Sequence, residues 1–144
     1  MIRFSDIAGN PVMDTSTATT VGKLEAPIID PATHRIVGFR VKKSKGPGDV
    51  LLWASVAGLG PDAVTVSSAE QVSDPPPELK DRSGRKLDVL KRPVLTEHGH
   101  PLGKVKDVEF DPSDGRVTNL LLKDSFVDGG RLLGIGKYAV VVAG

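Results

Sequence analysis

The sequence has 144 residues, of which 39% are hydrophobic and 26% charged, and a net charge of +1, which is the composition of an ordinary soluble globular chain of one domain or two small ones. It contains no cysteine, which excludes disulfides, thiolate metal sites and cysteine nucleophiles. No apolar run approaches the roughly 20 residues that cross a bilayer, and no apolar signal-peptide segment opens the chain, so we expect a cytoplasmic protein without a membrane span.

The first half of the chain predicts short strands joined by polar turns. An opening segment, FSDIAGNPV, leads into a short strand and a polar turn, and a strand that contains Gly22-Lys23 follows. Asp30-Pro31 predicts the next turn, because the Asp side chain can bond to the backbone ahead of it and Pro presets φ. The strand after it, RIVGFRVK, alternates apolar side chains toward one face. Residues 21–41 are therefore predicted to form a β-hairpin with the Asp-Pro turn at its tip.

A proline, the single tryptophan and a proline-rich segment give three further predictions for the first half of the chain and the segment that follows it. Pro27 interrupts a strand and predicts an edge position or a bulge, since proline cannot donate to a strand ladder. Trp53, the only tryptophan, follows two leucines and is interpreted as a core residue. The segment 73–84 contains three consecutive prolines and predicts a stiff polyproline II linker. No segment shows a long, capped 3.6-residue period, so helices should be few and short.

The same order of elements returns in the second half. The Gly-Lys strand returns 81 residues later at Gly103, and the Asp-Pro turn returns at Asp111 with the same offset. The closing segment GLGPDAVTV returns as GIGKYAVVV 76 residues later. Residues 102–122 are predicted to be the equivalent hairpin. The sequence thus predicts an all-β chain of two tandem units, 1–72 and 85–144, with the Pro-rich linker between them.

The second unit is five residues shorter than the first in the segment between Lys123 and Gly134. We interpret this gap as the loss of a counterpart to Leu51–Gly58. A unit of about 65 residues is marginal on its own. A truncated unit also leaves an unpaired strand edge or an uncovered apolar face. We therefore expect either that the two units pack together as one pseudo-symmetric body or that another chain fills the gap.

The order of these motifs resembles the PRC-barrel family. Both units contain Asp-x-x-x-x-Pro-Val, then Gly-Lys, then an Asp-Pro turn and an Arg-Val/Ile strand, over residues 4–72 and 86–142. The family is named for the photosynthetic reaction-centre H subunit, and it also forms the C-terminal domain of the ribosome maturation factor that binds a small-subunit ribosomal protein. The resemblance implies two small six-stranded β-barrels, usually with one short helix each. It implies no shared active site.

No motif predicts catalysis or cofactor binding. His98 and His100 could hold a metal only with a third ligand, and we favour a polar turn. The segment DPSDG resembles the start of a calcium loop, but Leu122 stands where the loop needs a glutamate. The glycine-rich segments do not continue as phosphate loops, and no nucleophile stands with a base. We therefore predict no catalytic, cofactor or metal residue, no enzyme activity and no small-molecule substrate.

Two basic runs, RVKKSK and KDRSGRKLDVLKR, are the candidate partner-binding segments, because clustered cations can contact phosphate or an acidic partner. The alternative interpretation is that they keep the chain soluble and protect strand edges. Aromatic residues are only 4%, which gives no stacking platform for single-stranded nucleic acid. The candidate residues are Arg40, Lys42, Lys43, Lys45, Arg85, Lys86, Lys91 and Arg92.

The function that fits these observations best is a non-enzymatic adaptor or scaffold that binds a protein partner or a second copy of itself. The alternative, implied by the maturation-factor branch of the family, is an RNA-processing or ribosome-assembly factor that binds a ribosomal protein or RNA.

Overall fold

The computed structural model describes all 144 residues, and its regular elements are strands and short 3₁₀ helices only. The predicted all-β class is therefore confirmed. None of the helical segments has the length and apolar character needed to cross a membrane.

The strands are β1 (Ile2–Arg3), β2 (Pro11–Asp14), β3 (Thr19–Asp30), β4 (Arg35–Lys42), β5 (Val50–Leu52), β6 (Gly58–Leu59), β7 (Val64–Val66), β8 (Val72–Ser73), β9 (Pro93–Thr96), β10 (Pro101–Lys104), β11 (Asp107–Phe110), β12 (Val117–Leu121), β13 (Phe126–Asp128), β14 (Leu132–Ile135) and β15 (Val140–Val142). The 3₁₀ helices are η1 (Phe4–Asp6), η2 (Trp53–Ser55), η3 (Ala69–Gln71), η4 (Pro77–Leu79), η5 (Arg85–Leu87) and η6 (Gly129–Arg131).

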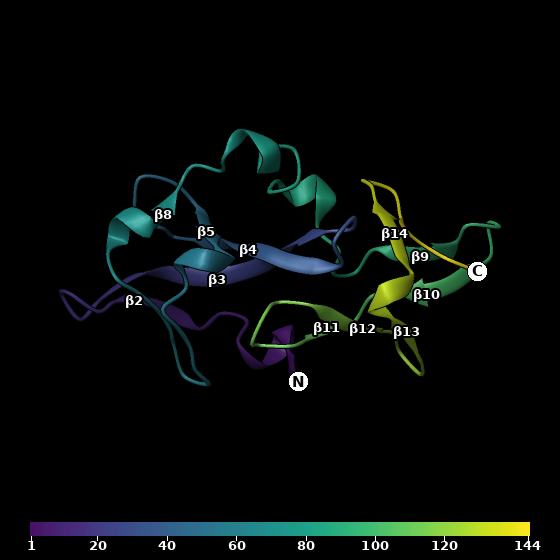
Figure 1. Cartoon of the computed structure of the whole chain (residues 1–144), viewed down its shortest axis with the longest axis horizontal. Coiled ribbons are helices and arrows are strands. Elements are labelled where there is room, and N and C mark those ends of the chain that lie inside the picture. Colours follow the sequence, from purple (N-terminus) through teal and green to yellow (C-terminus); the bar gives the residue numbers. More distant parts are fainter.

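The strands form three hydrogen-bonded sheets. The first unit contributes one sheet in the order β6-β7-β2-β3-β4-β5-β8. The strands of the second unit form two, β10-β9-β15-β14 and β11-β12-β13, and β1 of the first unit adds to β11 of the latter. In Figure 1 the first sheet occupies one end of an elongated body and β9, β10 and β14 occupy the other, with β11 beside the N-terminus and β13 below β14.

Strand pairing repeats from one unit to the other, which confirms the tandem duplication. In unit 1, β2 pairs antiparallel with β3 and parallel with β7, and in unit 2, β9 pairs antiparallel with β10 and parallel with β15. The parallel registers match, since Val12 opposes Val64 and Val94 opposes Val140. β3-β4-β5 likewise corresponds to β11-β12-β13. Each unit is thus a small curled barrel in which one short 3₁₀ helix, η2 or η6, precedes the last two strands.

The two predicted hairpins exist, with Asp30-Pro31 and Asp111-Pro112 at their tips. They differ in one respect. β3 is continuous over twelve residues, whereas its counterpart is divided into β10 and β11 at 105–106. The division falls at the position where β3 carries a β-bulge, so both units bend the chain at the same point, as a closing barrel requires.

Pro27 pairs with β4 on one side but has no strand neighbour on the other, which is the edge position that the sequence predicts. β2 pairs only with residues 19–23 of β3, so on that side Pro27 has no strand neighbour to which its missing N–H would have donated. A register shift lies on each side of Pro27 in the pairing with β4. The proline therefore costs the sheet no hydrogen bond.

The prediction that unit 2 lacks a counterpart to Leu51–Gly58 is wrong. β13, η6 and β14 take the places of β5, η2 and β6, and Val127 opposes Leu120 as Leu51 opposes Phe39. The five missing residues lie earlier, in the turn, because residues 43–49 join β4 to β5 whereas a much shorter turn joins β12 to β13. Loop length is the change that a β-barrel tolerates most easily, so unit 2 keeps all its strands.

One hydrophobic core holds both units. A single cluster of 25 buried residues includes side chains from strands of both units. Four aromatic rings form a continuous row through it, with centroids 6.1 Å apart for Phe4 and Phe39, 6.0 Å for Phe39 and Trp53, and 6.0 Å for Trp53 and Phe110. Trp53 therefore packs on the core, as expected, and joins a ring of unit 1 to a ring of unit 2.

The hairpin tips meet about a pseudo-two-fold axis. The backbone N–H of Ile36 donates to the carbonyl of Gly115, and the N–H of Val117 donates to the carbonyl of His34, both at 2.8 Å. Ile36 and Val117 are equivalent residues of the two units, and so are His34 and Gly115. Such reciprocal contacts are those of an isologous dimer, and here they join two halves of one chain. Of the two expected outcomes, the structure shows the single pseudo-symmetric body.

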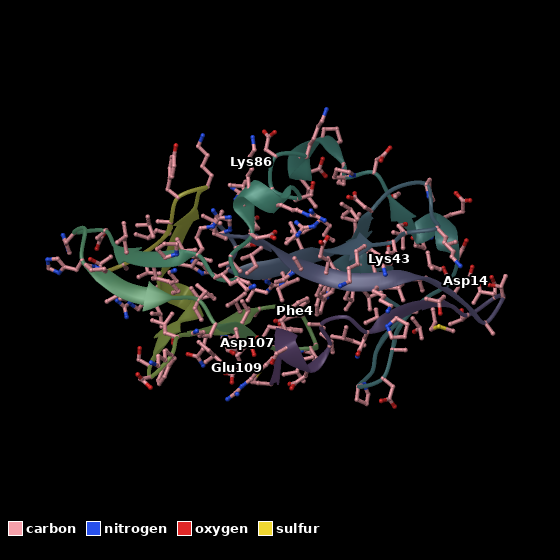
Figure 2. All side chains as sticks on the ribbon, turned by 180° about the vertical axis from the view of Figure 1, so that it is seen from behind. Phe4, Asp14, Lys43, Lys86, Asp107 and Glu109 are labelled. Carbon is pink, nitrogen blue, oxygen red and sulfur yellow. The ribbon has the colours of Figure 1, made fainter.

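The opening segment of each unit lies on the other unit. β1 pairs with β11 of unit 2, and Ser5 donates its backbone N–H to Asp107 Oδ1 at 3.1 Å. Figure 2 shows Phe4 of this segment next to Asp107. In the same way, the segment that opens unit 2 lies on unit 1, where Asp88 binds Arg40. This exchange adds charged and backbone contacts to the shared core.

The segment between the units runs along unit 1. It begins with β8, which pairs antiparallel with β5. Pro76 has φ −62° and ψ 157°, which is the polyproline II conformation, and η4 follows directly. The buried Ser83 then brings the chain to Arg40.

Candidate partner-binding surface

A groove of about 640 Å³ collects half of the candidate basic residues. It lies between the end of β4 with the loop after it, residues 42–49, and the segment 83–85 that opens unit 2. The candidates that line it are Arg40, Lys42, Lys43 and Arg85. Only one hydrophobic residue, Val41, faces it, so the groove is polar.

Arg40 is not a surface cation, which corrects the sequence interpretation. Its residue is only 6% exposed, and its guanidinium is fully engaged. Nε donates to Glu25 at 2.7 Å, and Nη1 and Nη2 donate to the two carboxylate oxygens of Asp88 at 2.7 and 2.8 Å. Nη1 also donates to the carbonyl of Ser83 at 3.2 Å. Because the bidentate partner lies 48 residues away, local sequence gives no sign of it, and Arg40 serves to hold unit 2 on unit 1.

Glu25 balances the second arginine of the groove. Its Oε1 accepts from Arg85 Nη2 at 3.0 Å while Oε2 accepts from Arg40. Burial opposes ionisation of Glu25, but the hydrogen bond and charge of Arg40, with those of Arg85, outweigh it and lower the pKa of Glu25 below its ordinary value. Arg40, Arg85 and Glu25 are therefore all ionised in the groove, and the charge of the carboxylate offsets that of the arginines.

Lys42 and Lys43 remain as groove cations without a salt bridge. Both are exposed, and Figure 2 shows Lys43 beside β4. Lys43 has φ 53°, in the left-handed region that costs a non-glycine residue roughly 1–2 kcal/mol. The neighbouring Lys45 is exposed but does not line the groove.

The other three candidates lie outside the groove. Arg92 donates to the backbone carbonyls of Asp88, Arg85, Lys86 and Lys137, so it fixes the start of unit 2 rather than facing a partner. Lys91 is exposed with φ 67°, at the position that Gly9 takes in unit 1. Lys86 is exposed beside the 3₁₀ turns of the linker (Figure 2).

One aromatic residue of this second basic region escaped sequence reasoning. Tyr138 is 79% exposed in the turn between β14 and β15, and Lys137 Nζ lies 5.2 Å from the centre of its ring. The signal in the sequence was the substitution of Lys-Tyr for Pro-Asp in an otherwise shared segment, GIGKYAVVV against GLGPDAVTV. Because this segment is a turn in both units, the sequence could have predicted that the Tyr138 ring is exposed.

The residues considered for metal chemistry lie in turns. His98 and His100 are exposed in the turn between β9 and β10. Asp111 accepts from the backbone N–H and the hydroxyl of Ser113, at 2.9 and 2.6 Å, and these bonds lower its pKa. No group of three or more His, Cys, Asp or Glu side chains is placed to hold a metal ion.

Unit 2 has its own version of the groove, with different chemistry. Its lining includes Arg3, Lys123 and Lys106, which stand at the positions of Arg85, Lys42 and Glu25. Leu121 replaces Arg40, so the ion pair of unit 1 has no counterpart here, and the lining combines three apolar residues with cations and with Asp107 and Asp124. Sequence reasoning missed this surface because its exposure depends on the short turn after β12.

The comparison with protein families agrees with the repeat. The family model for the PRC-barrel domain matches residues 1–72 and again residues 87–143. Because these matches cover nearly the whole chain, the protein belongs to the PRC-barrel family and contains two copies of its domain. Domains of this family are generally not catalytic. Comparison with curated proteins gives no significant match.

Proposed function

We propose that this protein is a non-enzymatic adaptor whose unit 1 groove binds an acidic segment of a partner protein. The observation that supports it is the pair of uncompensated cations, Lys42 and Lys43, on a groove of about 640 Å³ whose arginines are already neutralised by carboxylates. Asp49 also lines the groove, but the lining cations still outnumber the lining carboxylates by four to two. Such an excess of positive charge concentrates acidic ligands and steers their approach.

The chemistry of the groove favours a protein over RNA. Single-stranded RNA binds through bases stacked on aromatic side chains, and no aromatic residue lines this groove. The second candidate function, RNA processing or ribosome assembly, is favoured by a different feature, the exposed Tyr138 with Lys137 and Lys86 nearby. The two candidates therefore place binding on different residues.

We expect the double charge reversal Lys42→Glu/Lys43→Glu to weaken binding of an acidic partner by about tenfold or more, since removing two attractive contacts and adding two repulsive ones exceeds 1.4 kcal/mol. The measurement is affinity capture from the native host followed by mass spectrometry, with the affinity of the captured partner measured at two salt concentrations. Lys86→Glu/Lys137→Glu is the matched control, because it makes the same charge change outside the groove.

Loss of partner capture in the groove variant alone supports the proposal. Capture of RNA that is lost only in the control variant supports the second candidate. If the groove variant still binds its partner with unchanged affinity and salt dependence, the groove is not the binding surface.

A further inference from the structure

The two units share one hydrogen bond that different side chains make. In unit 1, Asn10 Nδ2 donates to the carbonyl of Pro61 at 2.9 Å. In unit 2, Arg92 Nη1 donates to the carbonyl of Lys137. Asn10 and Arg92 each stand directly before the Pro-Val of β2 or β9, and Pro61 and Lys137 are equivalent residues of the turn before the last strand. Unit 2 therefore shows what a longer side chain does at the position of Asn10.

Arg92 joins two turns of unit 2. Besides the carbonyl of Lys137, its guanidinium donates to that of Asp88 through Nε at 2.9 Å and to that of Lys86 through Nη2 at 3.0 Å. Nη2 also donates to the carbonyl of Arg85 at 3.4 Å. One planar group with several donors thus fixes the opening segment of unit 2 to the turn between β14 and β15.

Asn10 reaches only one of the corresponding turns of unit 1, and a hollow of about 430 Å³ lies between them. The opening segment of unit 1 forms one wall of the hollow, and β6 with the turn after it forms the other. Two lining residues, Asp6 and Pro61, are the equivalents of Asp88 and Lys137, whose carbonyls bind Arg92. The hollow therefore lies where unit 2 places a guanidinium. Its lining residues are Ile2, Asp6, Ile7, Leu59, Gly60 and Pro61.

The lining of the hollow suits a cation with a flat apolar surface. Asp6 is the only charged residue that lines it. The Asp6 carboxylate accepts from the N–H of Arg3 through Oδ2, at 3.0 Å, which leaves Oδ1 for a ligand. Asp62, which follows Pro61, is exposed and adds a second negative charge to its turn. The other lining residues are apolar or glycine, and they can pack against the methylene stem and the flat faces of an arginine side chain.

We propose that the hollow binds the side chain of an arginine of a partner protein, whose guanidinium takes the place that the guanidinium of Arg92 takes in unit 2. Asp6 accepts a charge-assisted hydrogen bond from it. Lysine fits less well, because its ammonium group is a compact charge without a flat face or a fork of donors. The hollow shares no lining residue with the groove of unit 1, so the inference does not depend on the function proposed for that groove.

A side chain fits the hollow better than a free guanidino compound does. Six residues line it, and two of them, Asp6 and Pro61, are exposed. The hollow can therefore cover one side chain, but it does not enclose a whole ligand as small-molecule sites do. Arginine is also enriched at the centres of protein interfaces, where it fills pockets of the partner.

The test uses two libraries of nine-residue peptides, with arginine or lysine at the centre and random residues elsewhere, selected on the immobilised intact chain. Arginine peptides should be enriched, should bind about tenfold or more tightly than their lysine versions, and should shift the amide resonances of Ile7 and Gly60. Asn10→Arg should weaken their binding about tenfold or more, because the new side chain occupies the hollow as Arg92 does in unit 2. Thr17→Arg, which adds the same charge to the exposed turn between β2 and β3, should leave binding unchanged.

A second pair of variants tests the carboxylate. Asp6→Asn keeps the shape of the hollow and should weaken binding about fivefold, because a hydrogen bond to a charged group becomes one to a neutral group. Asp74→Asn makes the same charge change at an exposed position that does not line the hollow, and it should have no effect. Thermal unfolding of each variant separates lost binding from lost folding, and Asp6→Asn keeps the test decisive if Asn10→Arg does not fold.

Four results would overturn the proposal. They are enrichment of neither library, lysine peptides that bind as tightly as arginine peptides, unchanged binding to Asn10→Arg, and unchanged binding to Asp6→Asn. A dimer of the wild-type chain that Asn10→Arg abolishes would assign the hollow to an arginine of a second copy and would also overturn it. So would N-acetyl-arginine amide that binds as tightly as the selected peptides, since the ligand would then be a small guanidino compound.

Discussion

Replacing Phe110 with alanine is expected to lower the free energy of unfolding of the whole chain by about 3–5 kcal/mol, the usual cost of deleting a fully buried aromatic side chain. Phe110 is 0% exposed and meets Trp53 edge-on, with ring centroids 6.0 Å apart. Its backbone also pairs with Ile2 of the exchanged opening segment. The cavity would therefore open at the junction of the two units.

Urea unfolding followed by circular dichroism and by tryptophan fluorescence measures this loss. Trp53 is the only tryptophan and belongs to unit 1, whereas Phe110 belongs to unit 2. We expect the midpoints of both signals to fall together. Phe126→Ala is the matched control, because the same atoms are removed at a position that is 66% exposed, with an expected change of about 0.5 kcal/mol. A fluorescence midpoint that stays at the wild-type value in Phe110→Ala would show that unit 1 does not depend on unit 2.

Replacing Arg40 with methionine is expected to cost about 3 kcal/mol, because at a largely buried junction it leaves Asp88 without its cation and Glu25 with Arg85 alone. Met preserves much of the apolar stem, so the loss reports the guanidinium. Arg35→Met is the control, since Arg35 reaches only Asp114, at 3.9 Å, and both side chains are exposed. Such a surface pair contributes about 0–1 kcal/mol. Equal losses for the two variants would contradict the role assigned to Arg40.

The pH dependence of stability separates the same two variants. The folded pKa of Glu25 lies below its ordinary value of 4.5, so its contribution to stability is fully present above about pH 4.5 and is lost as the pH falls through the folded pKa. Without Arg40 the larger of the two arginine contributions that lower the pKa of Glu25 is lost, and only that of Arg85 remains. The stability difference between wild type and Arg40→Met should therefore narrow below pH 4.5, while that for Arg35→Met should not.

Local signals were sufficient to predict most of the architecture. Asp-Pro turns, β-branched alternation and the Gly-Lys strands each depend on a few neighbouring residues, and the structure places all of them as expected. The position of the deletion was not predictable in this way. β13 and η6 keep the backbone register of β5 and η2, but the segment FVDGGR shares no side chain with VLLWAS.

The positions of the candidate binding residues were predicted only in part, for a related reason. Lys42, Lys43 and Arg85 meet in one groove although they come from two separate basic runs. The sequence analysis grouped Arg40 with these exposed cations. Alternation along a strand predicts which face a side chain lies on, but it does not predict a partner such as Asp88 that is distant in sequence. The exposure of Phe126 was not predicted, because it follows from the short turn between β12 and β13. The sequence of β13 itself does not indicate that the turn before it is too short to cover it.

Native-state hydrogen exchange of the intact chain tests the central claim, that two PRC-barrel units share one core and unfold as one body. Amides in β3 and β4 of unit 1 and in β12 and β15 of unit 2 should exchange with the same free energy of opening and the same dependence on denaturant, because the cluster of 25 buried residues joins them. If the amides of one unit exchange through an opening of distinctly lower free energy and weaker denaturant dependence, while those of the other remain protected, the units are independent domains and the account is wrong.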